Sequence, residues 1–273
     1  MASPVSHQRS FKNSWLRRNI VLAAIAALKR FRPRQSSVLF LTRRICVKYG
    51  PFQHLSSAET MQLIASNTSI PVPKIYCAFE RKGITYIVMS CARSTTIGHN
   101  WSERSDQSKT LLLQQLRGYI EEMRALKPPA PGVVGGVNGA KLYDPRIPDG
   151  VPGFGPFDTI QSFHSFLTSG IKMSPDGLPD INELLTLYQN SQFSTCLTHG
   201  DLNSANILVD GDKIVGIVDW DTCGWYPEYW EYTTAWNVNP YNVFWRDEVG
   251  KFLQEYPEAL RMEEIRLKYF GDF

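Results

Sequence analysis

The first fifth of this chain has no acidic residue. Of the 273 residues, the first 58 contain eleven Lys or Arg and no Asp or Glu, and the first carboxylate is that of Glu59. The remainder carries 18 basic and 26 acidic residues, so a formal net charge of +3 combines a basic start with an acidic remainder of net −8. Charge of this kind describes long-range fields and does not identify a binding pocket.

Cysteine pairs at metal-binding spacing are also missing. The five cysteines form no C-x-x-C pair and the five histidines are scattered, which excludes a disulfide framework and a structural zinc site of the usual spacing. A reducing intracellular compartment is the simplest interpretation, and we expect a cytoplasmic location. The cysteines are Cys46, Cys77, Cys91, Cys196 and Cys223.

No apolar run approaches the ~20 residues that a membrane-spanning helix needs, the longest near the start being Ile20 to Leu28. That run lies within the basic stretch FKNSWLRRNIVLAAIAALKRFRPR, which has a helical pattern up to the residue before Pro33. Three interpretations stay open for this arm, residues 1–35. It is a helix docked on the fold, a mitochondrial transit peptide, or a helix lying on an anionic membrane.

Short apolar runs follow the arm. SVLFL and RICVKY are separated by Arg43 and Arg44, which predicts two strands of a hairpin. Residues 56–67 predict a short helix, opened by a possible Ser56 to Glu59 capping box. IPVPKIYCAFE and GITYIVMS predict two more strands. The order β-β-α-β-β indicates a small mixed lobe over residues 36–92.

The remainder, residues 93–273, has mainly helical patterns. Apolar residues at helical spacing from Leu112 to Leu126 predict one long helix that stops before Pro128. Residues 128–157 are rich in Gly and Pro and predict a long loop, ordered or mobile, that shapes an acceptor cleft. Further helices are predicted over 157–167, over 181–188 and from Tyr229 onward. The aromatic residues of GWYPEYWEY are more typical of a core than of a box for a cation.

One segment concentrates polar residues that a core strand would not need. In LTHGDLNSANILVDGDKIVGIVDWD, residues 197–221, short strands alternate with loops, which brings Asp201, Asn206 and Asp219 close together. The oxygens of Asn206 and Asp219 suit Mg²⁺, a hard ion whose other ligands would be phosphate and water. Asp201 would then orient an attacking hydroxyl and accept its proton. Asp221 is interpreted either as a further ligand or, preferably, as a surface acid.

HGDLNSANILV and IVDWD resemble the catalytic and metal-binding segments of the aminoglycoside phosphotransferase and choline kinase-like family. SIPVPKIY, GPF and GWYPEYWEY resemble its fungal branch, so the resemblance runs from about Val38 to the C-terminus. It implies an α+β, bilobal protein-kinase-like fold with a small mixed β-sheet N-lobe and a larger, mainly helical C-lobe.

The resemblance also implies roles for single residues. Asp201 would be the catalytic base, His199 would brace the catalytic loop, and Asn206 and Asp219 would hold Mg²⁺. Lys48 would bind the α- and β-phosphates and pair with Glu59. The simpler alternatives are a solvated strand end for Lys48 and the capping box for Glu59.

The chain departs from the family pattern at the phosphate-binding hairpin, which has no glycine from Lys29 to Tyr49. Ser36 and Ser37 could offer a hydroxyl or a backbone N–H in place of glycine. Adenine would hydrogen-bond to the backbone near Met89 to Cys91. Nucleotide affinity is therefore the weakest of the implied properties.

We expect a Mg²⁺-dependent phosphotransferase that moves the γ-phosphoryl group of ATP, or of GTP, to a hydroxyl of a small-molecule acceptor. The alternative is a catalytically inactive, nucleotide-binding or scaffolding relative. No specific nucleic-acid partner is expected, because the basic arm lacks interleaved aromatic residues. Contact of the arm with a membrane surface stays possible, and a monomer or weak dimer is expected.

Overall fold

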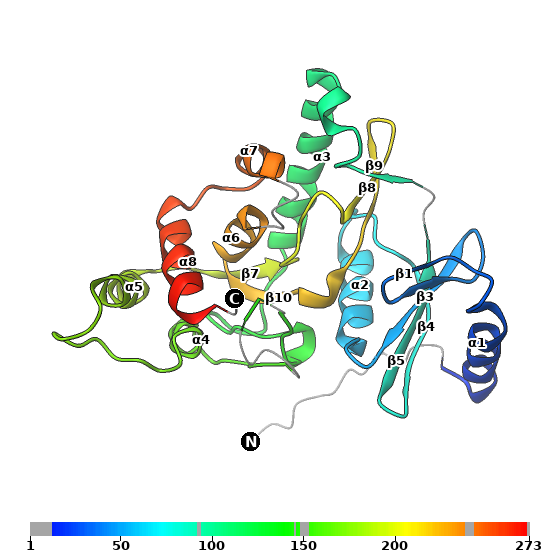
Figure 1. The fold of residues 1–273 in the computed structure, drawn as a ribbon, viewed down its shortest axis with the longest axis horizontal. Coiled ribbons are helices and arrows are strands. Elements are labelled where there is room, and N and C mark those ends of the chain that lie inside the picture. The colour runs from blue at the N-terminus through cyan, green and yellow to red at the C-terminus, as the bar shows by residue number, and fades with distance from the viewer. Residues whose placement is uncertain (1–12, 92–93, 145, 148–152, 238–242, 272–273) are drawn as a thin grey trace.

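The computed structural model describes residues 13–91, 94–144, 146–147, 153–237 and 243–271. Figure 1 shows a β-sheet lobe at one end and a larger, mainly helical lobe at the other. The predicted α+β, two-lobed architecture is confirmed. Strand β5 (Ile84–Ser90) ends and β6 (Thr95–Thr96) begins on either side of the predicted lobe boundary at residue 92.

The N-lobe is a five-stranded sheet in the order β1-β2-β3-β5-β4, with antiparallel neighbours throughout. Its other elements are α1 (Trp15–Leu28), β1 (Arg34–Gln35), β2 (Val38–Phe40), β3 (Ile45–Gly50), α2 (Leu55–Asn67) and β4 (Ile75–Arg81). The predicted hairpin and the strands 75–81 and 84–90 are present. The pattern missed β1, because two exposed polar residues carry no period-2 signal.

Helix α1 is docked on the outer face of this sheet. Ser14 caps it by accepting a hydrogen bond from the Arg17 N–H, and Val21 and Ile25 are buried among sheet residues that include Val47 and Phe79. Side chains on a strand alternate between faces, so neighbouring sheet residues point to the opposite side, where α2 packs. The docked-helix interpretation of the arm is confirmed for residues 15–28, whereas residues 1–12 lie outside the described part.

Helix α2 begins two residues earlier than a capping box with Ser56 as its N-cap predicts. Its N-cap is His54, which makes no side-chain capping bond, and its first residue is Leu55. Ser56 therefore lies inside the helix, and the Ser56 to Glu59 capping box is wrong. The predicted end at Asn67 is correct.

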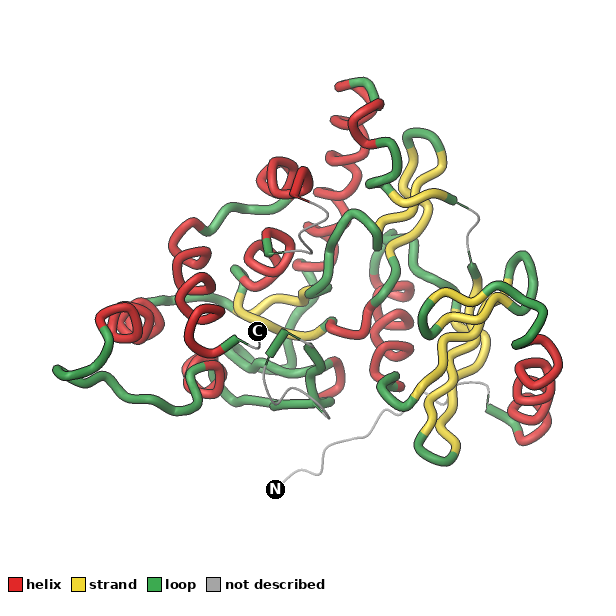
Figure 2. The backbone as a smooth tube through the Cα atoms, viewed as in Figure 1, coloured by secondary structure: helices red, strands yellow, loops and turns green. Residues whose placement is uncertain are grey.

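The C-lobe contains the other described helices and two small sheets, ordered β10-β7 and β6-β8-β9. Figure 2 shows helices around these strands. Their bounds are α3 (Asp106–Arg124), α4 (Ile160–Leu167), α5 (Pro179–Asn190), β7 (Thr195–Thr198), β8 (Ile207–Asp210), β9 (Lys213–Ile217), β10 (Gly224–Pro227), α6 (Trp230–Trp236), α7 (Val243–Phe252) and α8 (Pro257–Phe270). Over its described residues, the tail predicted as helical from Tyr229 forms α6, α7 and α8 and not one continuous helix.

The aromatic segment after β9 belongs to the core. Trp225, Tyr226, Tyr229 and Trp230 are each at most 5% exposed, and the rings of Tyr226 and Trp230 stack at 5.4 Å. This confirms the preference for a core over a cation box.

The Gly- and Pro-rich segment 128–157 is ordered where it is described. Bridges pair Val134 with Phe157 and Leu142 with Phe154, and a third joins Gly135 to Trp225 of β10. Of the two alternatives for this segment, ordered or mobile, the described residues support the ordered loop. Within the described ranges, no helix is both long enough and apolar enough to cross a membrane.

The buried His164 in α4 predicts that stability falls on acidification. Burial lowers the pKa of His164 to about 3, from 6.5, and its ring stacks on Tyr188 at 3.8 Å. Between these two values the unfolded chain binds a proton that the folded protein does not. Stability is therefore full above pH 6.5 and is lost as pH falls, by about 2 kcal/mol at pH 5.

Urea unfolding at pH 7.5 and pH 5 measures this loss. The variant His164→Phe should lose about 2 kcal/mol less than the wild type over the same interval. The exposed His99 supplies a matched control, since His99→Phe should keep the wild-type pH dependence. An unchanged pH dependence in His164→Phe would contradict the assignment.

Candidate active site

The loop between β7 and β8 is held by the ring of His199. This ring is fully buried, its Nε2–H donates to the Val218 carbonyl at 3.0 Å, and its Nδ1 accepts the Asp201 N–H at 3.2 Å. Burial lowers the pKa of His199, which keeps the imidazole neutral as this bonding requires. His199 thus ties Asp201 to the strand end that precedes Asp219.

A buried carboxylate on α6 holds the same loop from the other side. Glu231 is 0% exposed, and its two oxygens accept the backbone N–H groups of His199 at 2.6 Å and Gly200 at 3.0 Å. Sequence reasoning missed Glu231, because it lies inside an aromatic segment interpreted as core. The available signal was an acid within a segment interpreted as core, since a buried charge needs partners.

The Asp201 carboxylate is fixed by two amides. Oδ1 accepts a hydrogen bond from Asn203 Nδ2 and Oδ2 accepts one from Asn206 Nδ2, each at 2.9 Å. Burial raises the pKa of Asp201, while the positive charge of Arg146 opposes that rise. A desolvated, oriented carboxylate of this kind is suited to accept a proton from a hydroxyl.

Asn206 and Asp219 meet across the β8–β9 hairpin. The Val218 N–H donates to the Asn206 carbonyl at 2.9 Å, so Asp219 directly follows a residue paired with Asn206. Asp219 adopts a left-handed backbone conformation, with φ of 67° and ψ of 60°. Such strain is tolerated where it aims a functional side chain. The structure thus brings together Asp201, Asn206 and Asp219, as predicted.

Lys48 pairs with two aspartates and not with Glu59. Its Nζ lies 2.6 Å from Asp219 Oδ1 and 2.6 Å from Asp221 Oδ2. Burial alone would lower the pKa of Lys48, but Asp221 and Asp219 outweigh burial and raise it. Glu59 contacts Asn138 at 3.4 Å instead. The predicted Lys48–Glu59 pair is therefore wrong in this state, because two nearer carboxylates hold the ammonium.

The surface interpretation of Asp221 is also wrong. Its side chain is only 13% exposed, and it follows Asp219 in a short 3-10 helix, Trp220–Thr222. One oxygen binds Lys48, whereas Oδ1 is buried without a hydrogen-bond partner among the described residues. The signal in the sequence was the second acid of IVDWD, two residues after the first.

Removing the charge of Asp221 should affect stability more than removing the charge of Glu59. Asp221→Asn should lower the unfolding free energy of the nucleotide-free protein by about 1–3 kcal/mol, because it weakens a buried pair. Glu59→Gln is the matched control and should change it by less than about 0.5 kcal/mol. Urea unfolding measures both. If Glu59→Gln lowered the unfolding free energy as much as Asp221→Asn does, the result would argue that Lys48 also pairs with Glu59 in solution.

The donor set around these residues fits Mg²⁺. Among the described residues no group of three or more His, Cys, Asp or Glu forms a metal shell. Mg²⁺, however, commonly takes one or two protein oxygens and completes its shell with phosphate and water. Asn206 and Asp219 supply such oxygens, and the unpartnered Asp221 Oδ1 adds another next to them.

Comparison with known proteins agrees with this geometry. Residues 169–265 match the model of the phosphotransferase enzyme family. The aminoglycoside phosphotransferase APH(4)-Ia superposes with a TM-score of 0.62 at 14% identity, over 93% of this chain and 89% of the other. This chain has the aminoglycoside phosphotransferase fold. The resemblance to that family is confirmed, while its fungal branch stays a prediction.

Two further solved structures share the fold. A gentamicin complex of APH(2'')-IIa matches with a TM-score of 0.56 at 13% identity, over 92% of this chain and 85% of the other. A thermostable mutant of APH(4)-Ia in ternary complex with ADP and hygromycin B matches with a TM-score of 0.59 at 14% identity, over 85% and 79%. Comparison with curated proteins gives no match.

The phosphotransferase fold here has a glycine-free hairpin beside Lys48. Ser36 and Ser37 form the turn between β1 and β2, and Val38 pairs with Lys48 across β2 and β3. Ser36 takes the left-handed φ of 50° that glycine would adopt without strain. The two serines therefore occupy the predicted place of the missing glycines.

The Cys91 backbone N–H, which was predicted to contact adenine, is already hydrogen-bonded within the protein. The Cys91 N–H donates to the Arg44 carbonyl at 3.0 Å, and the Ser90 N–H donates to the Lys74 carbonyl at 2.9 Å. Met89 lies within β5, opposite Cys46. Adenine at this strand end would have to replace one of these bonds or donate to a backbone carbonyl. Residues 92 and 93 lie outside the described part.

An ion pair from the ordered loop also reaches the β7–β8 loop of this phosphotransferase fold. Asp144 is 0% exposed and binds Arg146 through both of its oxygens, at 2.7 Å each. Arg146 also donates to the Gly200 carbonyl, next to Asp201. Sequence reasoning assigned this segment to the acceptor cleft and missed both residues, since nothing in YDPRI shows where the loop returns.

Proposed function

We propose that the protein transfers the γ-phosphoryl group of ATP, or of GTP, to a hydroxyl of a small-molecule acceptor. The observation that carries this proposal is the Asp201 carboxylate, held by Asn203 and Asn206 beside Asp219 and Lys48. Those residues supply a base, metal-binding oxygens and a phosphate-binding cation, which are the parts that phosphoryl transfer requires.

Asp201 would accept the proton of the acceptor hydroxyl as its oxygen bonds to the γ-phosphorus. The bond from that phosphorus to the β–γ bridging oxygen breaks at the same time, and the nucleoside diphosphate leaves. Mg²⁺, held by Asn206 and Asp219, would neutralise charge on the phosphate oxygens. Lys48 would move from Asp219 and Asp221 to the non-transferred phosphates.

The acceptor is proposed only as a class. Structures that share this fold are described with hygromycin B, gentamicin or streptomycin. A hydroxylated amine would suit the chain beyond residue 91, which carries 24 acidic and 15 basic residues. Because such a charge balance acts at long range, it favours cationic acceptors in general and selects none of them.

The alternative is a catalytically inactive relative that binds nucleotide or acts as a scaffold. The glycine-free hairpin and the engagement of Lys48 by two carboxylates favour it. Both features oppose phosphate binding. A hairpin without glycine approaches phosphate less easily, and the Lys48 ammonium must leave Asp219 and Asp221 before it can bind a phosphate.

Thermal denaturation with ATP, GTP or ADP, with and without Mg²⁺, separates the two proposals. A ligand that binds only the folded protein raises the midpoint by mass action. We expect a Mg²⁺-dependent rise that Asp219→Ala abolishes, followed by phosphorylation of an acceptor in a screen of hydroxylated amines. A rise of the midpoint without phosphorylation of any acceptor would support the inactive relative. No rise of the midpoint at millimolar nucleotide would oppose a nucleotide site.

A further inference from the structure

The outward side of helix α1 is apolar although it faces away from the sheet. Val21 and Ile25 pack against the sheet, and successive helical residues turn by about 100°, which puts Leu16 on the opposite side and Ile20 on the flank next to it. Four side chains on α1 or just after it are mostly exposed, and together we call them the α1 outer face: Trp15 at 78%, Leu16 at 60%, Ile20 at 58% and, in the turn that follows the helix, Phe31 at 83%.

Exposed large apolar side chains are concentrated at α1. Eleven large apolar side chains of the described residues are exposed, and four of them fall within residues 15–31. Figures 1 and 2 show α1 at the end of the N-lobe that is remote from the helical lobe, with no described segment over its outward side. A clustered exposed apolar surface marks an interaction site more often than isolated residues do.

Basic residues surround the α1 outer face. Residues 1–91 contain 14 Lys or Arg and only two acids, whereas the rest of the chain is acidic. Twelve of these Lys and Arg residues lie within the described residues 13–91, so positive charge is gathered at the lobe that carries α1. Five basic residues on or just after the helix are exposed: Arg17, Lys29, Arg30, Arg32 and Arg34.

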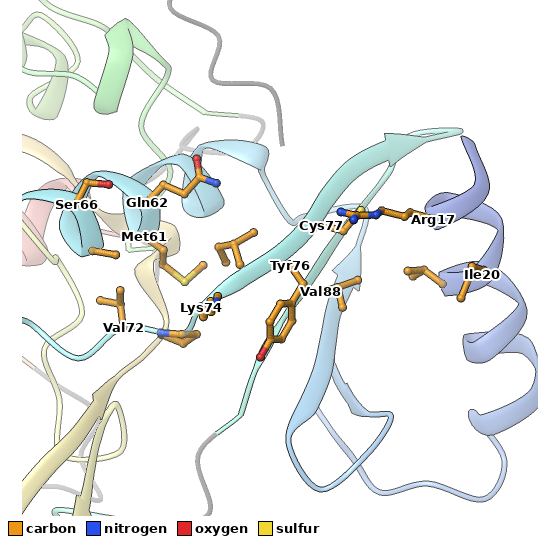
Figure 3. A pocket seen from close by; sticks show the side chains of 14 residues that line it. Arg17, Ile20, Met61, Gln62, Ser66, Val72, Lys74, Tyr76, Cys77 and Val88 are labelled. Atoms are coloured by element: carbon orange, nitrogen blue, oxygen red, sulfur yellow. The ribbon is translucent and has the colours of Figure 1, made fainter. Parts of the chain in front are cut away.

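A groove extends this surface toward the sheet edge. It has a volume of about 1180 Å³ and lies between α1, β4 and α2. Figure 3 shows Arg17 and Ile20 on its α1 side, and Lys74 and Tyr76 on its strand side. The groove therefore adds a further cation and further apolar surface to the same side of the lobe.

We propose that the α1 outer face docks on a lipid bilayer containing anionic phospholipid. The apolar side chains would enter the boundary between headgroups and acyl chains, while the surrounding Arg and Lys bind lipid phosphates. A second copy of the chain is a poorer occupant, because a symmetric pair would bring two strongly basic surfaces together.

Docking leaves the candidate active site free. Lys48 follows Val47 on β3, so its side chain points to the face of the sheet opposite α1. The membrane proposal therefore does not depend on the proposed phosphotransferase activity, and each can fail without the other.

Flotation of the full chain with lipid vesicles tests the proposal. Vesicles of phosphatidylcholine alone are compared with vesicles containing about 30% phosphatidylserine. Binding to the anionic vesicles is expected, weakened by salt, and about tenfold weaker in Leu16→Ser/Ile20→Ser. The matched control is Ile171→Ser/Leu178→Ser, which changes the same residue types at exposed sites of the C-lobe and should bind as wild type does.

Two further readouts identify the surface and the occupant. Anionic vesicles should shift the tryptophan emission of the wild type to the blue, and the shift should be lost in Trp15→Phe. Absence of vesicle binding, or equal loss in the two double variants, would overturn the proposal. So would a dimer in light scattering that Leu16→Ser/Ile20→Ser abolishes, because the α1 outer face would then bind a second copy.

Discussion

Replacing Asp201 by Ala is expected to lower the rate of phosphoryl transfer by about 10³-fold. The variant loses the carboxylate that we propose as the acceptor of the hydroxyl proton. Asn206 and Asp219 remain, so Mg·ATP should still raise the thermal midpoint. Steady-state kinetics with an identified acceptor, measured together with the nucleotide-dependent midpoint, tests both parts.

Asp210→Ala provides the control for this prediction. Asp210 ends β8 on the same hairpin but is exposed, so its removal should leave rate and midpoint near wild type. An unchanged rate in Asp201→Ala would remove Asp201 from the mechanism. Loss of the nucleotide-dependent rise would instead make its main role the support of the metal site through Asn206, which donates to its carboxylate.

Replacing Glu231 by Gln is expected to lower the rate by about 10²-fold without direct contact with the reacting atoms. The buried carboxylate accepts two backbone N–H groups, and an amide presents its own NH₂ to one of them. An unsatisfied buried donor costs about 1–3 kcal/mol, which shifts the catalytic loop or lowers the stability of the protein. A small misplacement of Asp201 reduces transfer sharply.

The effect of Glu231→Gln should fall on kcat more than on the binding of Mg·ATP, since Lys48 and Asp219 do not contact Glu231. Kinetics at saturating nucleotide measure the effect on kcat, and thermal denaturation with nucleotide measures the effect on binding. Glu228→Gln is the matched control, because Glu228 lies just before the same helix and, among the described residues, its carboxylate accepts a hydrogen bond from the Ser194 hydroxyl and from no backbone N–H. Equal rates in the two variants would show that the loop keeps its geometry without the carboxylate.

Much of the local structure could be predicted because its causes are local. Short apolar runs predicted β3, β5 and β7, and apolar residues at helical spacing predicted α3, since each pattern comes from neighbouring residues of the element it forms. The proximity of Asp201, Asn206 and Asp219 followed from two tight connections between short strands. The element missed in the N-lobe, β1, has two residues and therefore no period to detect.

The pairing of charged groups could not be predicted in the same way. Ser56 and Glu59 have the spacing of a capping box, yet the helix begins at Leu55. Glu231 and Arg146 hold the β7–β8 loop from an aromatic helix and from a Gly- and Pro-rich loop. Neither segment shows in its own residues which part of the chain it will contact.

By itself the sequence determined the two-lobed architecture, the short strands of residues 197–221 and the identity of the polar residues in that segment. Only the tertiary structure decided that Lys48 pairs with Asp219 and Asp221, which lie 171 and 173 residues away. It also decided that one side of α1 is buried while the other stays open. Contacts at such separations depend on how complete lobes pack, because short-range periodicity constrains the face of an element and not its partner.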